Sequence, residues 1–579
     1  MRLGLLALVA VLCAAQAGAQ TPMPAQPAKA PTIVPSRVAP KPLTTAPVPA
    51  APGAMIEGAN ALYIVRYDHW TDADERAYGE FITAIGESGC HRVNDCLHIA
   101  QNPFRASDPP GVEFHSDCAD LPYVLRAYYA WKRGLPFSYE SAVEPRGHTR
   151  DIRYTPNGNE VVERKDVLTG SVSGYELLDE IRDIISSASY RIHPDLDGPL
   201  TPDMYSPAID AKSIRPGSMV YDPNGHVATI YKIDPDGRAE YIDAHPDNSV
   251  TRGYYDERFV RSRPGMGAGF KNWRPMKLVG ATRRTDGVYI GGRVVVATNK
   301  EIADYSEVQF FGTAARPTAD GDWANGSFML NGEYLDYYDW VRAKLAGGKL
   351  EFDPVKEVHD MVESNCNDMH YRYDAVVLAL QAGLQTRSEP ERLPANIYGT
   401  EGDWEDFSTP SRDARLKTAF KELHDQVMRF ARMYVAGDKK LVYTGHDLVA
   451  DMQDAYDRTA SACKLTYQRS DGSPVTLGYE EMRKRLFLMS FDPYQCVERR
   501  WGATDAAELS TCGDGPEKQA WYAAEQNLRN QLDRTYDAEM DFTLEELRTP
   551  GPGKGVAQPP DTDVLGYLWS VRGAQPKPK

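Results

Sequence analysis

Residues 218–243 read SMVYDPNGHVATIYKIDPDGRAEYID, and this stretch determines which fold the first half of the chain can adopt. Two turns of the type Asp-Pro-X-Gly, at 222–225 and 234–237, interrupt an otherwise apolar run. Proline and glycine at these positions favour tight turns, and short apolar runs between turns favour strands. The sequence therefore predicts consecutive strands of a small antiparallel sheet. These strands are expected at 218–221, 226–233 and 240–243.

A helix is predicted upstream, from about Cys118 to Gly134. Its apolar face repeats at helical spacing through Leu121, Val124, Leu125 and Tyr128. Ser116 or Asp117 can cap this helix, which places Cys118 in the first turn. Unpaired backbone amides and the helix dipole favour a thiolate there, and the same amides can hold a negatively charged oxygen. Cys118 is therefore the predicted nucleophile.

A histidine and two further side chains supply candidate partners for that nucleophile. His226 stands at the start of an apolar strand, which would hold its ring rigidly, so it is the predicted base. Asp243 and His245 follow on the next predicted strand. Either could accept the second imidazole proton and fix the tautomer of His226, with Asp243 the stronger candidate.

The cysteine count points to one free thiol. Without Cys13 in the N-terminal apolar run, the number of cysteines is odd. In an oxidising compartment an even set would pair. Neighbours in sequence suggest the pairs Cys90–Cys96 and Cys496–Cys512, and Cys366 with Cys463 would complete three bridges. Parity does not identify the free thiol, but the sequence around Cys118 favours that residue.

Three short motifs resemble the NlpC/P60 and CHAP branches of the papain-like cysteine peptidase superfamily. They are Asp117–Leu121, Arg215–Val220 and Gly225–Ala228. The resemblance implies a papain-like domain that cleaves peptidoglycan peptides, with Cys118 as nucleophile and His226 as base. Asp243 falls where CHAP members carry an acidic orienting residue, and His245 where they carry asparagine. The resemblance covers only about residues 100–275. Ala119-Asp120 replaces the family's small residues and is closer to transglutaminase-like relatives.

The predicted fold class is α+β: a helix packed on a small antiparallel sheet, followed by a mainly helical half. An apolar run ending in Ala17-Gly18-Ala19 is typical of a signal peptide. A lipoprotein anchor at Cys13 is the weaker alternative, because bulky Leu12 precedes it. The predicted segments are a signal peptide at 1–19, a Pro/Ala-rich linker at 20–53, the papain-like domain at 54–280, a β-rich connection at 281–330, a mainly helical domain at 331–548 and a loose tail at 549–579.

These features predict an exported thiol hydrolase, periplasmic or secreted, that acts on peptidoglycan or other envelope peptides without a metal or organic cofactor. A formal net charge of -17 argues against nucleic-acid binding, and no later apolar run is long enough for a transmembrane helix. The helical half is expected to bind an envelope protein or to restrict access to the site. Two alternatives remain: a transglutaminase-like acyl transferase, and a non-catalytic envelope binding protein on the same fold.

Overall fold

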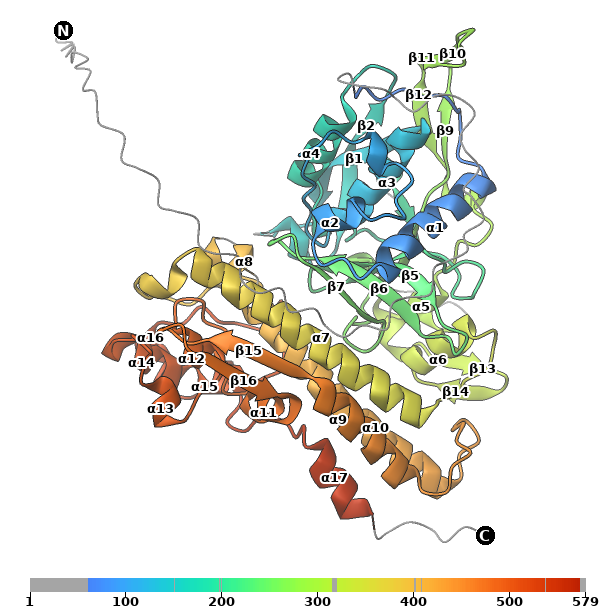
Figure 1. Ribbon diagram of the computed structural model, residues 1–579. Helices are drawn as coiled ribbons and strands as arrows, with labels where there is room; N and C mark the ends of the chain where they lie inside the picture. The colour runs from blue at the N-terminus through green and yellow to red at the C-terminus, as the bar shows by residue number, and fades with distance from the viewer. Residues whose placement is uncertain are drawn as a thin grey trace, which may run out of the picture. The chain divides into compact units, whose positions relative to one another are not determined.

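A six-stranded sheet lies at the centre of the first half of the computed structural model (Figure 1). Its strand order is β3-β8-β4-β5-β6-β7, and all neighbours are antiparallel. The predicted strands correspond to β4, β5 and β6. The strands are β3 (Met204–Tyr205), β4 (Met219–Asp222), β5 (His226–Ile233), β6 (Ala239–Ala244), β7 (Val250–Tyr254) and β8 (Gly269–Trp273).

The structure describes residues 61–149, 151–196, 198, 200–314, 320–399, 402–407, 409–536 and 538–572. The predicted signal peptide and linker, together with Cys13, lie outside the described residues. The described residues all belong to one compact unit. The chain is α+β, as predicted. Of the helices in the described ranges, none combines the length and apolar character needed to cross a lipid bilayer.

Two glycines close the turns that fix the sheet. Gly225 and Gly237 have φ angles of 92° and 84°, in the left-handed region that favours glycine. At Gly237 a Cβ atom would lie 2.0 Å from the carbonyl oxygen of Arg342, so the turn also packs closely against helix α6 (Tyr337–Leu345), which contains Arg342. The Asp-Pro-X-Gly pattern therefore encodes both the hairpins and their packing.

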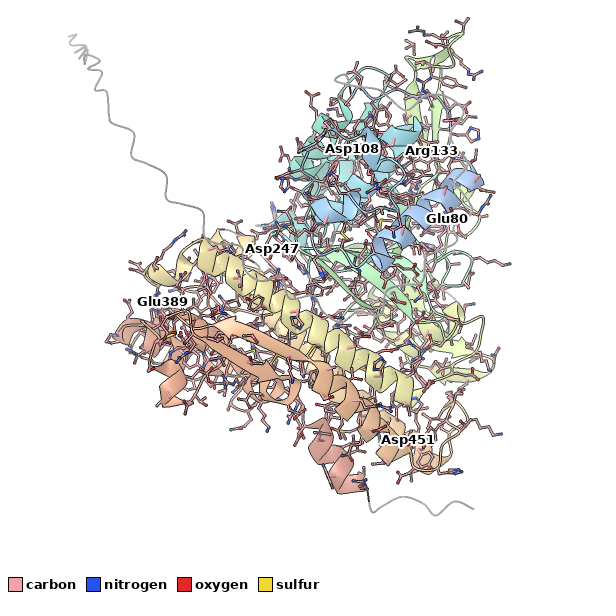
Figure 2. All side chains as sticks on the ribbon, in the orientation of Figure 1. Glu80, Asp108, Arg133, Asp247, Glu389 and Asp451 are labelled. Atoms are coloured by element: carbon pink, nitrogen blue, oxygen red, sulfur yellow. A yellow bond between two sulfur atoms is a disulfide. The ribbon has the colours of Figure 1, made fainter. Side chains whose placement is uncertain are left out.

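Helices α1 (Asp72–Glu87) and α3 (Leu121–Arg133) build the apolar core beside this sheet. Every α3 residue from Leu121 to Trp131 is buried, and the cations of this helix are paired. Arg126 contacts Glu75 at 2.6 Å, and Lys132 contacts Asp108, which is labelled in Figure 2, at 2.5 Å. These pairs allow a helix with charged side chains to lie inside the domain.

Smaller elements complete the first half. Strands β1 (Phe137–Pro145) and β2 (Asn159–Val167) form a hairpin, and β9 (Met276–Val279) pairs with β12 (Arg293–Val296). The segment predicted to be β-rich does contain strands, together with one short helix. The remaining elements are α2 (Val93–Leu97), α4 (Gly174–Ile184), β10 (Thr282–Arg283), β11 (Tyr289–Ile290), α5 (Val308–Phe311), β13 (Phe328–Leu330), β14 (Glu333–Leu335) and α6 (Tyr337–Leu345).

Three long helices organise the second half: α7 (Pro354–Gln381), α9 (Thr409–Ala436) and α10 (Leu448–Ala462). They share an apolar core, and the Cys366–Cys463 disulfide ties α7 to the end of α10. The shorter elements are α8 (Asp403–Asp406), β15 (Lys464–Gln468), β16 (Pro474–Gly478), α11 (Tyr479–Arg485), α12 (Val497–Arg500), α13 (Ala506–Leu509), α14 (Pro516–Ala524), α15 (Gln526–Asn530), α16 (Leu544–Leu547) and α17 (Val564–Val571).

The described part of the expected loose tail, residues 549–572, includes a packed helix. Val564 and Leu568 of α17 are 1% and 0% exposed, and both belong to the core shared by the long helices. The prolines between 550 and 560 exclude a helix there. The apolar stretch VLGYLW that follows buries Val564 and Leu568, and this burial holds a short helix in place.

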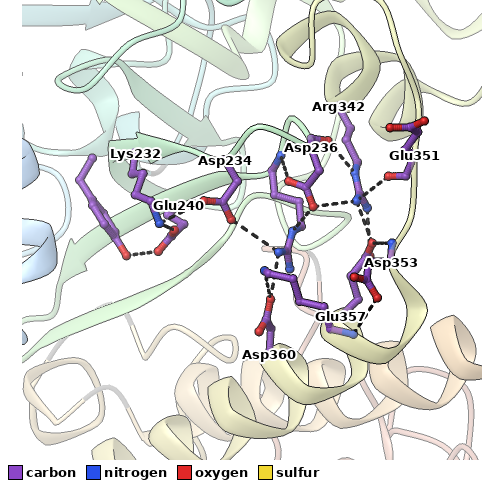
Figure 3. Close-up of polar contacts among 12 residues, drawn as sticks. Lys232, Asp234, Asp236, Glu240, Arg342, Glu351, Asp353, Glu357 and Asp360 are labelled. Atoms are coloured by element: carbon purple, nitrogen blue, oxygen red, sulfur yellow. Dashed lines mark hydrogen bonds and ion pairs between the residues drawn. The ribbon is translucent and has the colours of Figure 1, made fainter. Parts of the chain in front are cut away.

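Ion pairs join the sheet of the first half to the helices of the second half (Figure 3). Arg342 of α6 contacts Asp236 of the β5–β6 turn at 3.1 Å and Glu357 of α7 at 2.8 Å. Arg238, which follows the same turn, contacts Asp360 of α7 at 2.9 Å. The hairpin that carries the predicted base is thus fixed directly to α6 and α7.

A buried ion pair between α7 and α9 gives a stability prediction. Arg372 binds Asp413 through two hydrogen bonds of 2.8 and 2.9 Å, and both side chains are almost fully buried. Asp413→Ala would leave a guanidinium without its counter-charge, so we expect a loss of about 3–5 kcal/mol of unfolding free energy. Urea denaturation followed by circular dichroism measures this loss. Asp425→Ala, which removes an exposed pair with Lys421 on the same helix, should cost under about 1 kcal/mol. Equal losses in both variants would contradict the argument.

Candidate active site

Cys118 lies in a turn that leads directly into α3. The regular helix begins at Leu121, three residues after the predicted start, and Cys118 lies in the turn that precedes it. The carboxylate of Asp117 accepts the amides of Ala119 and Asp120 at 2.7 and 3.1 Å, which is the capping role predicted for this residue. Leu121 then donates its amide to the Asp117 carbonyl oxygen at 3.2 Å, which starts the helix.

Cys118 is the free thiol among the described residues. The three predicted disulfides, Cys90–Cys96, Cys366–Cys463 and Cys496–Cys512, are present. The Cys118 side chain is half-buried, and its Sγ lies 3.8 Å from the carbonyl oxygen of Gly225. A thiol is a weak donor at that distance, so this contact leaves the sulfur available for chemistry. Gly225 directly precedes His226, so sulfur and imidazole belong to the same small region.

His226 and Asp243 form a short hydrogen bond of 2.6 Å between Nε2 and Oδ2. The hairpin register explains their meeting. Thr229 pairs with Ile242 across β5 and β6, so Asp243 lies opposite Ala228, two residues from His226 and on the same face of the sheet. An ionised Asp243 fixes the proton of His226 on Nε2, and Nδ1 is then the unprotonated nitrogen.

Asp243 is completely buried and satisfies several donors at once. Thr251, its cross-strand partner on β7, donates its hydroxyl to Oδ1. His245 contacts Thr251 at 3.1 Å through Nε2, which lies 4.0 Å from Asp243 Oδ2. The His226 ring therefore hydrogen-bonds directly to Asp243, while His245 contacts the threonine that donates to the same carboxylate.

Two arginines of α9 complete the site, and the sequence analysis did not identify them. Arg415 Nη1 lies 3.1 Å from Asp243 Oδ2, the same oxygen that His226 contacts. One turn earlier, Arg412 Nη2 lies 2.9 Å from Oδ2 of Asp247, a residue labelled in Figure 2. The signal was present in the run Ser-Arg-Asp-Ala-Arg at 411–415, where charged residues stand next to the apolar face that begins with Leu416.

Cys118 and His226 face one cavity of about 130 Å³ whose walls come from both halves of the chain. From the first half, it is lined by Asp117, Cys118, Ala119, Arg153, Tyr154, Ser186, Ser187, Gly225, His226, His245, Pro246 and Thr251. From the second half, it is lined by Asp368, Tyr371, Tyr398, Glu405, Ser411, Arg412, Arg415 and Leu416. The helical half thus supplies a wall of the cavity that contains the thiol.

Burial and nearby charges make thiol and imidazole neutral at rest. Burial, followed by the Asp117 carboxylate, raises the pKa of the Cys118 thiol. Burial and the Arg415 guanidinium lower the pKa of His226 to about 4, although its bond to Asp243 acts the other way. Burial alone would raise the pKa of Asp243, but His245, His226 and Arg415 together hold it below its usual range. The raised pKa of Cys118 runs against the expected resting thiolate, because desolvation favours the neutral thiol.

No family model, no curated protein and no solved structure matches this chain.

The neutral thiol predicts a characteristic alkylation profile. In protein produced without residues 1–19, thiol titration under denaturing, non-reducing conditions should find one free thiol per chain, which Cys118→Ser removes. In the native protein, the rate of modification by iodoacetamide should keep rising above pH 8, because the pKa of the Cys118 thiol is raised. Glutathione, with an ordinary thiol pKa, is the reference. A rate that reaches its plateau below pH 7 would indicate a preformed thiolate and contradict this electrostatic description.

The contact between Arg415 and Asp243 predicts the titration of His226. A nearby guanidinium disfavours the imidazolium, so the His226 ring should stay neutral down to about pH 4. In Arg415→Gln, we expect the His226 pKa to rise toward the ordinary histidine value of about 6.5. Histidine NMR titration, assigned with His226→Gln, measures both values. Arg432→Gln, at an exposed position of α9, is the matched control. A His226 pKa that is the same in both variants would exclude this role for Arg415.

Proposed function

We propose that this chain is an exported thiol hydrolase that cleaves amide bonds in peptides of the cell envelope. The observation that carries the proposal is the 2.6 Å bond between His226 and a buried Asp243, beside the free thiol of Cys118. A nucleophile, a base and a group that orients the base are the parts that acyl transfer through a thiol requires. The sequence resemblance of the Cys118 and His226 motifs to papain-like peptidases supports the same roles.

The electrostatics favour proton transfer during attack over a preformed ion pair. His226 Nδ1 would accept the thiol proton as Cys118 Sγ bonds to the substrate carbonyl carbon. The imidazolium formed in this step is stabilised by Asp243, which keeps its negative charge. His226 then returns the proton to the leaving amine, and a water molecule, activated by the same nitrogen, hydrolyses the acyl-enzyme.

The turn before α3 also indicates which amide would hold the developing oxyanion. The amides of Ala119 and Asp120 are already bound to Asp117. Within the described ranges, the Cys118 amide has no hydrogen-bond acceptor. It is next to the nucleophile, where negative charge develops on the carbonyl oxygen, and such donors commonly contribute a large part of transition-state stabilisation. We assign the Cys118 amide this role in place of the two amides that follow it.

The substrate class follows from the compartment and from the resemblance. Disulfides persist in proteins outside the cytoplasm, and three are present in the described residues. Together with the N-terminal apolar run, they support export to the periplasm or beyond. Peptidoglycan stem peptides are the amide-containing substrates that papain-like envelope enzymes of the resembled branches cleave. The reaction as written needs no cofactor.

Digestion of purified sacculi tests the proposal. The wild-type protein should release fragments with new amino termini, while Cys118→Ala should release none. His226→Ala should lower the rate about 100-fold or more, because general acid–base catalysis typically contributes 10²- to 10⁴-fold. The control is His69→Ala, which removes an exposed histidine bonded to Asp68 at 2.7 Å. Identical fragment profiles for wild type and Cys118→Ala would remove peptidoglycan hydrolysis as the function.

A further inference from the structure

Among the charged side chains that line the cavity, the arginines are ion-paired and two of the carboxylates are not. Each arginine that lines it is bound to a carboxylate: Arg153 to Asp151 and Glu405, Arg412 to Asp247, and Arg415 to Asp243. The two histidines of the lining, His226 and His245, have lowered pKa values of about 4 and 3 and are neutral at pH 7. The cations of the lining are therefore compensated.

Two carboxylates of the lining have no ion-pair partner among the described residues. Asp368, on α7, is half-buried, and in the described part of the chain it forms neither a hydrogen bond nor an ion pair. Asp117, next to Cys118, accepts backbone amides but likewise has no ion-pair partner there. Burial raises the pKa of Asp368 to about 6, so this carboxylate is largely ionised above neutral pH. Arg258 and Arg415 favour the charged form of Asp368 without contacting it, so the thiol faces a cavity in which this carboxylate has no cation in direct contact.

Aromatic rings add a second feature that favours a cation. Tyr154, Tyr371 and Tyr398 line the same cavity, and Tyr154 has one face stacked on Tyr536. The faces of aromatic rings attract ammonium groups, and sites that combine such rings with a carboxylate commonly bind amines. Neutral amides would gain little from an unpaired carboxylate, and an anionic group would be repelled by it.

We propose that this cavity binds a protonated amine of the substrate, with Asp368 as the residue that determines this preference. The inference rests on the proposed thiol chemistry, because it places the ammonium group beside the bond that Cys118 attacks. Asp368 then acts on specificity, and not on the proton transfers. An α-ammonium at a peptide N-terminus and a side-chain ammonium share the required chemistry.

Charged thiol reagents test this proposal without a known substrate. Three methanethiosulfonates of similar size, bearing trimethylammonio-ethyl, hydroxyethyl and sulfonatoethyl groups, form mixed disulfides with a free thiol. Intact-mass kinetics at pH 8 give the rate for Cys118 with each reagent, relative to 2-mercaptoethanol. We expect the cationic reagent to be favoured over the anionic one, and Asp368→Asn to lower that ratio about tenfold. Glu363→Gln, at an exposed position of α7, should leave the ratio unchanged.

The outcomes separate the two proposals. Cys118 that reacts with all three reagents in a ratio unaffected by Asp368→Asn would overturn the amine site and leave the hydrolase intact. Cys118 that reacts with none in the native protein would show a closed cavity and overturn both.

Protection by amines identifies the source of the charge. Alaninamide supplies an α-ammonium, Nα-acetyl-lysinamide a side-chain ammonium, and N-acetyl-alaninamide neither. Equal protection of Cys118 by all three against the hydroxyethyl reagent would also overturn the amine site.

Discussion

The carboxylate of Asp243 is the group on which the site depends. It is completely buried, and an isolated charge in that position would be strongly unfavourable. It stays ionised because its oxygens accept hydrogen bonds from His226, Thr251 and Arg415, contributed by β5, β7 and α9. The same bonds orient the imidazole toward the cavity that contains Cys118. The hydrogen bonds that stabilise the buried charge of Asp243 therefore also fix the position of the candidate base, His226.

This dependence makes the second half of the chain part of the site. Arg415 can reach Asp243 only while α9 is docked, and α9 is held against α7 by the buried pair of Arg372 and Asp413. The ion pairs of Arg342 in turn fix α7 to the hairpin that carries His226 and Asp243. Loss of the helical packing would remove a charge from the site as well as a wall from the cavity. The charge state of Asp243 in the first half therefore depends on Arg415 in the second half.

The sequence predicted contacts that are encoded locally and missed those made by tertiary packing. The turns at 222–225 and 234–237 define a hairpin, so the proximity of His226 and Asp243 followed from spacing alone. The disulfides followed from parity and neighbourhood. Arg415 was missed because it lies 172 residues from Asp243, and no periodicity records which face of α9 meets the sheet. The burial that raises the pKa of the Cys118 thiol was likewise not predictable, since it depends on what packs over the residue.

Burial, with Arg415 as the second cause, lowers the pKa of His226 and so disfavours a preformed thiolate–imidazolium pair. His245, His226 and Arg415 together hold the pKa of Asp243 below its usual range. The His226 imidazole is then unprotonated across the physiological pH range, so the nitrogen that would accept the thiol proton is free of a proton at these pH values. The larger energetic cost is the loss of the thiol proton, because burial and the Asp117 carboxylate raise the pKa of Cys118. A positively charged substrate group near Asp117 and Asp368 would offset that cost, so the unpaired Asp368 carboxylate and the raised pKa of Cys118 fit the same proposed ligand.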